Sequence, residues 1–308
     1  KGEISLNTSD FGWIVGHLFM VYGPLIRCAT SLFLEGKPVG TPDCSICFKL
    51  IEKYQVKIFY SCPTVLRLFK LEDPELKIIS KYDISSLETL ALSGERCDIP
   101  SFEWSLKIGG QDKVINDHWW QTESGYPICC NNVNIKTFPS IPGVTGYPIP
   151  GFDVHIMDME NKKEITEPDI KGEVCIKYPT PPSFMQTFYL ENKKFEDQFV
   201  KIGEDLYYDT GDLGEWEKCG GIHIISRHDD MIKVAGHRLS SGKIEEVACQ
   251  LAEVNQCGVA AWKDPLKGEI PFAFCVIGQG LKIDSKELTA KINSNIMSTI
   301  GAISRIKG

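Results

Sequence analysis

The segment Asn116–Gly125 (NDHWWQTESG) brings together the side chains of this chain that are best suited to chemistry. Two adjacent indoles, Trp119 and Trp120, offer a wide apolar wall, and a hydroxyl and a carboxylate follow at Thr122 and Glu123. Such a site can hold a small apolar group next to a metal-bound phosphate, because Mg²⁺ takes a few carboxylate ligands together with phosphate oxygens. The alternative is that both tryptophans are core aromatics that touch no ligand.

Two shorter motifs carry polar groups at turns. In Tyr208–Asp212 (YDTGD), the Asp212 carboxylate follows a tight Thr-Gly turn and can accept two ribose hydroxyls. A simple turn is the competing interpretation, because Gly and Asp are common turn residues. Ser93–Asp98 (SGERCD) comes directly after an apolar strand, and its exposed backbone can line an adenine ring. Each motif alone is a weak signal.

The segment Ser226–Arg238 (SRHDDMIKVAGHR) is dense in His and Asp. Its spacings fit no standard metal-ligand set. A charged, glycine-bearing turn between domains fits better, and Arg227 and Arg238, eleven residues apart, can contact a phosphate and a ribose. A solvated charged loop remains the alternative.

Composition limits the class of protein. The 308 residues suffice for two domains, and the net charge of -8 argues against a nucleic-acid binder, which needs a basic footprint. No apolar run approaches the ~20 residues that span a bilayer, and Lys1–Ile4 has no signal-peptide pattern. We therefore expect small-molecule substrates, with no nucleic-acid or membrane partner.

The twelve cysteines predict scattered reduced thiols in a reducing compartment rather than a disulfide scaffold. Cys44 and Cys47 form a lone C-x-x-C without a second pair at zinc-site spacing, so a metal or redox site there is the lesser alternative. Cys129 and Cys130 are expected to pack in a core or loop.

Strand-like and helix-like patterns alternate in the first half of the chain, which predicts an α/β architecture. A buried helix over 17–29 and a second helix over 45–55 precede or flank strands at 56–61, 89–92 and 114–116. A stretch rich in Pro and Gly over 139–151 then introduces short alternating strands at 153–159, 173–178 and 221–226, a β-rich subdomain over about 140–226. Beyond residues 229–230 we expect a helix over 244–253, strands at 258–262 and 272–277, and a helix over 285–300 that Asp284 caps, with Glu287 completing a capping box.

Taken together and in this order, the motifs resemble those of acetyl-CoA and propionyl-CoA synthetases, of the firefly-luciferase-like adenylate-forming superfamily. The resemblance runs over nearly the whole chain and includes the blocks Ser9–His17 and Val21–Leu25. Several segments look closer to the propionate-type, mitochondrial branch: 35–43, 94–98, 117–120, 234–238 and 263–268. The implied fold is α/β: a large N-terminal domain with a β-rich subdomain over residues 1–228, and a small mobile α+β C-terminal domain over residues 229–308.

The resemblance also implies a reaction. A carboxylate attacks the α-phosphate of ATP to give acyl-AMP and pyrophosphate, and the thiol of CoA then attacks the acyl carbon and releases AMP. ATP, Mg²⁺ and CoA are the implied cofactor and substrates. A tryptophan floor limits chain length by excluded volume, so discrimination among acetate, propionate and butyrate is expected to be modest, at ~1–3 kcal/mol per methylene.

By the same resemblance, residue roles carry over motif by motif. Glu123 is the implied Mg²⁺ ligand and, with Arg238, the catalytic pair; Asp229 is the implied hinge. The nucleotide pocket comprises Gly94, Glu95, Arg96, Asp117, His118, Trp119, Trp120, Gln121, Thr122, Asp212, Arg227 and Arg238. The acyl pocket comprises Ile14, Val15, Ser93 and Trp120, and the CoA tunnel Val15, Val39, Ala235 and Gly236.

Three departures from the family pattern accompany this match. The phosphate loop is expected upstream of Lys1 and the catalytic lysine downstream of Gly308, so this chain alone is expected to adenylate very poorly. Met297 occupies the position of an arginine that grips CoA phosphate, which puts CoA affinity in doubt. An acetate-specific synthetase and a catalytically inactive nucleotide-binding homologue therefore stay open as alternatives to the propionate-type enzyme.

Overall fold

The structure is a computed structural model that describes residues 2–109, 113–132, 135, 138–228, 230–278 and 280–307. It divides into two compact units, one made of Lys1–Thr210 with Glu215–Ile224, and the other of Gly211–Gly214 with Ile225–Gly308. The predicted domain boundary between residues 228 and 229 stays a prediction.

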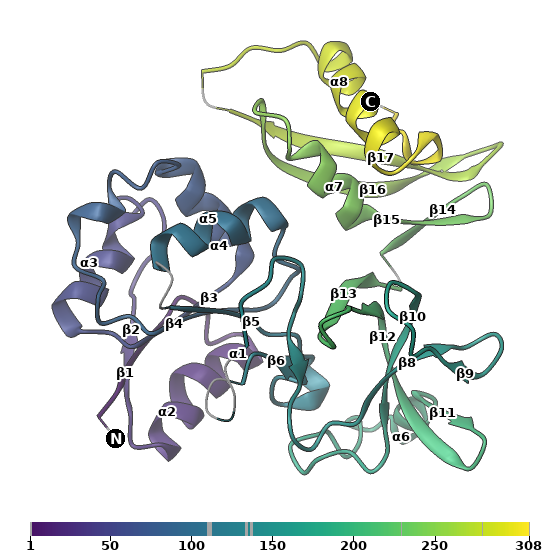
Figure 1. Ribbon diagram of the computed structural model, residues 1–308, viewed down its shortest axis with the longest axis horizontal. Helices are drawn as coiled ribbons and strands as arrows, with labels where there is room; N and C mark the ends of the chain where they lie inside the picture. Colours follow the sequence, from purple (N-terminus) through teal and green to yellow (C-terminus); the bar gives the residue numbers. More distant parts are fainter. Residues whose placement is uncertain are drawn as a thin grey trace. The chain divides into compact units, whose positions relative to one another are not determined.

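A parallel sheet forms the beginning of the first unit (Figure 1). Its strand order is β2-β1-β3-β4-β5, and all neighbouring pairs run parallel. The strands are β1 (Ile4–Asn7), β2 (Thr30–Phe33), β3 (Ile58–Ser61), β4 (Thr89–Leu92) and β5 (Val114–Asp117). The expected strands over 56–61, 89–92 and 114–116 are thereby confirmed.

Three helices cover one face of this sheet: α3 (Ser45–Tyr54), α4 (Pro63–Glu72) and α5 (Ile99–Gly109) (Figure 1). Their apolar faces meet the strands in one core, in which Phe48 of α3, Phe69 of α4 and Phe59 of β3 pack as an aromatic triplet. The helix expected over 45–55 is confirmed. It ends where Gln55 turns left-handed at φ 54°.

The expected buried helix over 17–29 is only partly right. The helical stretch is α1 (Ile14–Gly16), the π-helix η1 (His17–Tyr22) and α2 (Gly23–Ile26). Its buried positions are Gly16, Met20 and Pro24, four residues apart, while Leu25 is 65% and Ile26 81% exposed. Only one narrow stripe of this helical segment is buried. Its apolar side chains are spread around the whole helix surface, so an apolar composition does not by itself predict which of them are buried.

The β-rich subdomain is an antiparallel sheet of order β11-β12-β10-β8-β9, with β13 also paired to β12. Its strands are β8 (Val154–Asp158), β9 (Lys163–Glu164), β10 (Lys171–Lys177), β11 (Phe199–Ile202), β12 (Asp205–Trp216) and β13 (Ile222–Arg227). A separate ribbon joins β6 (Cys129–Cys130) to β7 (Tyr147–Pro148), and a short helix, α6 (Asn192–Glu196), precedes β11. Cys129 and Cys130 are buried, Cys129 within the core of this region, as expected.

The second unit is α+β, as predicted. Its sheet has the order β15-β14-β17-β16, built from β14 (Met231–Val234), β15 (His237–Ser240), β16 (Val254–Asp264) and β17 (Gly268–Ile277). Helices α7 (Ser241–Ala248) and α8 (Ser285–Thr299) share one core with it, which includes Val247, Ile292 and Ile296. Among the residues that the structure describes, no helix is both long and apolar enough to cross a membrane.

Candidate active site

The parallel register of the first sheet lines up the residues at its carboxyl edge. Ser61 pairs with Leu92, and Leu92 pairs with Asp117. The chain continues the pattern, since the Ser93 amide donates to the Ser61 carbonyl at 3.2 Å and the His118 amide to the Leu92 carbonyl at 2.8 Å. Polar residues that are distant in sequence thus meet at the edge where α/β proteins bind ligands.

An aromatic group of Phe19, Tyr60, His118, Trp120 and Tyr126 lies at this edge. Phe19 stacks on Tyr60 with ring centroids 4.3 Å apart, and the Trp120 and Tyr126 rings lie 5.9 Å and 6.5 Å from it. Tyr60 is also 5.5 Å from the His118 ring. The group supplies the apolar wall that the tandem tryptophans suggested, but Phe19 is its centre.

The predicted acyl-pocket residues Ser93 and Trp120 both attach to this group. The Tyr60 hydroxyl donates to the Ser93 hydroxyl at 2.8 Å, and both residues are buried. Trp120 is half-buried and meets the Phe19 ring edge-on. Ile14 and Val15, the other predicted pocket residues, are half-buried in α1, whereas Val39 packs against the core of the first sheet.

Sequence reasoning missed Phe19, Tyr60 and Tyr126. Tyr60 stands at the end of an apolar strand, and Tyr126 follows the tandem-tryptophan segment, so both lay next to positions that were singled out. Phe19 belongs to the π-helix His17–Tyr22. Such insertions are frequent at functional sites, but their register is not readable from sequence periodicity.

Trp119 and Trp120 have different environments. Trp119 is 9% exposed, packs in the core of the β-rich region and pairs its main chain with Cys129 at 3.0 Å. The indole of Trp119 therefore contributes to packing, which agrees with the alternative interpretation of this residue as a core aromatic. Its contact with a nucleotide stays a prediction. Trp120 faces the aromatic group instead.

Burial shifts the ionisation of two adjacent side chains at the end of β5. It raises the pKa of the Asp117 carboxyl to about 7, and the positive charge of Arg96 works against this shift. Burial lowers the pKa of the His118 imidazole to about 4. Near neutral pH, His118 is therefore uncharged and Asp117 is only partly ionised, so both are suited to hydrogen bonding rather than to ion pairing.

The turn after β4 is held from outside by Glu95. Its carboxylate accepts the Thr64 amide at 2.8 Å and pairs with the Arg67 guanidinium at 2.5 Å, while Arg67 also binds Asp98 at 3.0 Å. Gly94 takes φ 98°, a conformation that favours glycine. With the Glu95 side chain engaged at the start of α4, backbone atoms are what this turn offers to a planar ligand.

The polar half of the tandem-tryptophan segment forms a short turn, η3 (Thr122–Ser124). The Gln121 side chain donates from Nε2 to the Thr210 carbonyl at 2.6 Å, and the Met185 backbone amide donates to the Glu123 main-chain carbonyl at 2.8 Å. The second bond holds the backbone at Glu123. The Thr122 side chain is exposed and Glu123 is half-buried. A hydroxyl and a carboxylate on adjacent residues form an oxygen donor set that suits Mg²⁺.

In the second unit, Asp212 and Arg227 come from β12 and β13. Asp212 is 5% exposed, and Gly211 takes φ 70° beside the Arg227 guanidinium, so that a β-carbon there would lie 3.5 Å from Arg227 Nη2. The His228 amide donates to the Gly211 carbonyl at 2.7 Å. A β-carbon at that distance would make an ordinary contact with Arg227, so it is the positive φ that favours glycine at position 211.

Ala235 and Gly236 form the two-residue turn between β14 and β15. Val234 pairs with His237, and both turn residues have positive φ, 48° and 85°. This conformation matches the primed turns that join antiparallel strands. Both residues are exposed. The Arg238 main chain pairs with Lys233, while the Arg238 side chain and all of Asp229 lie outside the described residues.

The C-x-x-C pair lies within the first core. Cys44 and Cys47 are buried free thiols, and burial raises the pKa of each to about 12. Because metal ligation and thiol exchange require the thiolate, this environment opposes the metal or redox alternative.

These features define a class. A parallel sheet with a ligand edge, an antiparallel β-rich region and a small α+β unit make the fold of adenylate-forming enzymes. An anthranilate CoA ligase solved in complex with anthranoyl-AMP superposes with a TM-score of 0.80 at 22% identity, over 99% of this chain and 55% of that one. The amide bond synthetase McbA from Marinactinospora thermotolerans gives 0.77 at 18% identity, over 100% and 57%.

The chain belongs to the AMP-binding enzyme family. The model of that family matches residues 1–189, and the model of the AMP-binding enzyme C-terminal domain matches residues 243–308. A rat protein named acyl-CoA synthetase short-chain family member 3, mitochondrial, is 35% identical over 99% of this chain and 44% of its own length. Family member B from Dictyostelium discoideum is 38% identical over 100% and 44%, and a propionate–CoA ligase from Salmonella typhimurium 34% over 97% and 47%. The chain therefore spans less than half the length of these relatives.

Proposed function

We propose that the protein carrying this sequence is an AMP-forming acyl-CoA synthetase for short-chain carboxylates, with propionate preferred and acetate and butyrate accepted. The observation that carries the proposal is the aromatic group, in which half-buried Trp120 faces Phe19, with Thr122 and Glu123 two and three residues further along the chain. The names of the relatives support the choice of acid.

The reaction needs little covalent chemistry from the protein. The acid's carboxylate oxygen attacks the α-phosphate of ATP and pyrophosphate leaves. The CoA thiol then attacks the acyl carbon, loses its proton and expels AMP. Positioning and charge stabilisation dominate such transfers. The backbone of the turn at Gly94–Arg96 suits the adenine, and the aromatic group suits an acyl chain of two to four carbons, with Trp120 as its limit.

Other residue roles complete the proposal. Glu123, with Thr122 beside it, would hold Mg²⁺, which when bound neutralises phosphate charge. Asp212 and Arg227 are proposed as ribose ligands and Arg238 as a phosphate ligand. Ala235 and Gly236, exposed and without a bulky side chain, suit passage of the CoA arm, and Asp229 is the proposed hinge. The mitochondrial matrix is the proposed location, with the cytoplasm as alternative, because mitochondrial relatives are among the most similar.

The test is carboxylate-dependent exchange of labelled pyrophosphate into ATP, measured on the whole protein. We expect exchange with propionate above that with acetate or butyrate, and release of AMP only after CoA is added. Exchange with acetate alone would make the protein an acetate-specific synthetase. A folded protein that binds AMP but shows no exchange with any of these acids would be the inactive homologue, and the proposal would be wrong.

A further inference from the structure

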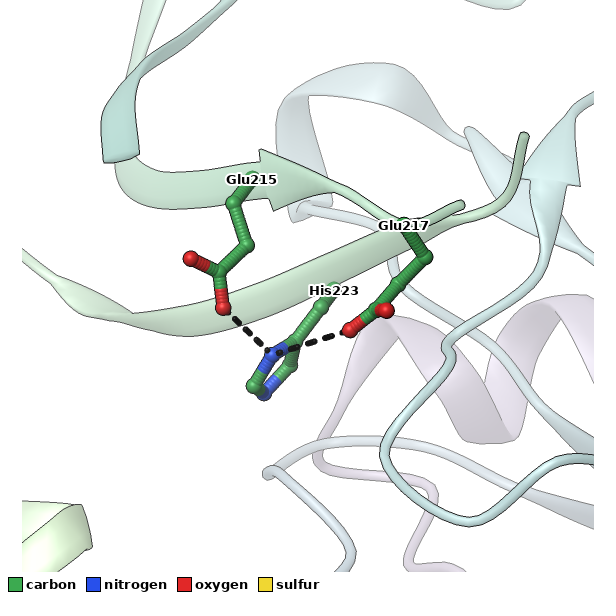
Figure 2. A group of neighbouring side chains, drawn as sticks. All are labelled: Glu215, Glu217 and His223. Atoms are coloured by element: carbon green, nitrogen blue, oxygen red, sulfur yellow. Dashed lines mark hydrogen bonds and ion pairs between the residues drawn. The ribbon is translucent and has the colours of Figure 1, made fainter. Parts of the chain in front are cut away.

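Three side chains outside the proposed active site converge on one point of the β-rich region (Figure 2). His223 of β13 directs its Nδ1 towards Glu215 Oε1 of β12 at 3.1 Å and Glu217 Oε1, just beyond β12, at 3.8 Å. One ligand atom from each residue lies within 4.8 Å of the other two. The three side chains are 16–31% exposed, so the group is partly open to solvent.

These separations suit a divalent ion. With metal–ligand bonds of about 2.0–2.2 Å, the ligand atoms around a four- or six-coordinate ion lie roughly 3–3.5 Å apart. The Glu215 oxygen lies at that spacing from His223 Nδ1, and the Glu217 oxygen needs to approach the nitrogen by a few tenths of an ångström. The two carboxylate oxygens lie within 4.8 Å of each other and would close on the ion as it binds. An imidazole nitrogen with carboxylate oxygens is a donor set for zinc and neighbouring first-row ions, and water would fill the remaining positions.

The charge around the group favours a cation. The Glu217 carboxylate is repelled by Glu215 and then by Asp169, and Lys218 supplies a partial counterweight. Lys218 is 81% exposed at its side chain and pairs with Asp169 at 3.2 Å. When His223 is neutral, two carboxylates therefore crowd one nitrogen, and a bound divalent ion would relieve their repulsion.

A second histidine in the same sheet provides a contrast. His155 also has two carboxylate neighbours, but its Nδ1 meets Glu164 at 2.7 Å and its Nε2 meets Asp153 at 3.2 Å. Because the two nitrogens point to opposite sides of the ring, those carboxylates cannot share an ion with one nitrogen. His155 faces its two carboxylates through different nitrogens, whereas Glu215 and Glu217 face a single nitrogen of His223.

We propose that Glu215, Glu217 and His223 form a binding site for a first-row divalent metal ion such as Zn²⁺. The ion would clamp the β12–β13 hairpin at its turn, where the Glu217 amide donates to the Gly221 carbonyl at 2.9 Å and the Gly220 amide to the Glu217 carbonyl at 2.8 Å. The site is structural. It does not depend on the proposed synthetase activity.

The test is titration of the chelator-treated protein with Co²⁺, followed by its visible d–d absorption and by calorimetry. We expect one equivalent to bind. The affinity should fall by at least about 10–100-fold in His223→Gln and in Glu215→Gln, because that is the loss typical of an outer-shell partner and these residues are direct ligands. The Co²⁺ affinity should rise with pH, because His223 binds the metal only after its imidazole has lost its proton. A hydrogen-bonded pair of protonated His223 with Glu215 would instead weaken as the pH rises.

Two control variants separate this site from other ligands. His155→Gln should bind Co²⁺ as the unchanged protein does. Cys219→Ser should also retain binding, which excludes the exposed thiol two residues beyond Glu217 as the source of the signal. Three results would overturn the proposal. They are an unchanged Co²⁺ affinity in His223→Gln, a loss of Co²⁺ binding in Cys219→Ser, and no Co²⁺ binding at all to a cooperatively folded protein.

Discussion

Asp117 and His118 are adjacent at the carboxyl edge of the first sheet, yet their ionisation affects folding stability in opposite directions. The folded-state pKa of Asp117 is raised from 3.8 to about 7, so its contribution is present below about pH 4 and is lost as pH rises towards 7. The folded-state pKa of His118 is lowered from 6.5 to about 4, so its contribution is present above about pH 6.5 and is lost as pH falls. Between about pH 4 and pH 7, a rise in pH therefore lowers the free energy of unfolding through Asp117 and raises it through His118.

Separate substitutions should expose the two effects. In Asp117→Asn only the His118 effect remains, so we expect the free energy of unfolding to rise between pH 5 and pH 7 by up to about 2 kcal/mol more than in the unchanged chain. In His118→Gln the free energy should fall over the same interval. Urea denaturation at several pH values measures both. Parallel pH profiles for all three proteins would contradict the assigned burial of these groups.

Trp120 is the residue proposed to limit the acid's length. Trp120→Ala should enlarge the pocket and shift the preference from propyl-AMP towards butyl-AMP by roughly tenfold, in line with ~1–3 kcal/mol per methylene. Competition binding of the two esters measures the shift. The matched control is Trp262→Ala, since Trp262 is 59% exposed in the second unit; it should leave the preference unchanged. If Trp120→Ala weakened the binding of both esters equally, Trp120 would not lie at the end of the bound alkyl group.

At the residue scale, sequence motifs singled out Ser93, Asp117 and Trp120, which the structure places at or near the carboxyl edge of the first sheet, while their roles stay predictions. They did not locate Phe19 or Tyr60, which reach the same place through the π-helix and through the parallel register of β3 with β4. Such contacts join residues 41 positions apart in the sequence, and no local pattern encodes them.

At the scale of single elements, the start of α8 is held by Asp284, whose side chain accepts the amides of Lys286 at 2.9 Å and Glu287 at 3.4 Å. Glu287 pairs with Lys291 at 3.1 Å, whereas the capping-box expectation had it turning back to the cap. Asp284→Ala should therefore cost about 1 kcal/mol of stability in the second unit. Glu287→Ala should cost under about 0.5 kcal/mol, because it removes only an exposed ion pair. Thermal unfolding compares the two, and equal losses would restore the capping box.

Strands and helices with alternating or one-sided apolar patterns were predictable. The helix expected over 244–253 instead begins at Ser241 and ends at Ala248, because the Ser240 side chain caps the Lys243 amide at 3.3 Å. A capping serine within a Ser-Ser-Gly run is hard to distinguish from a loop residue. The 17–29 helix was misjudged for a different reason: burial depends on what the element packs against, which lies outside its own sequence.

At the scale of the whole molecule, the chain holds separate cores, and α8 belongs to that of the second unit. Ile296 is fully buried and its neighbour Met297 is 52% exposed. Ile296→Ala should destabilise that unit by about 2–5 kcal/mol, and Met297→Ala by less than about 0.5 kcal/mol. Calorimetric unfolding distinguishes them. Similar losses in both variants would mean that α8 is rotated relative to the structure.

The central claim is that the described chain forms a pocket for a short-chain acyl adenylate. The most direct measurement is a thermal-shift titration with ethyl-, propyl- and butyl-AMP, which mimic acyl-AMP, with AMP as control. Binding to the folded state raises its apparent stability by about 2.7 kcal/mol at a hundredfold excess over Kd. The account predicts a larger shift with propyl-AMP than with ethyl-AMP or AMP. A chain that melts cooperatively but shows no shift with any ester would contradict it.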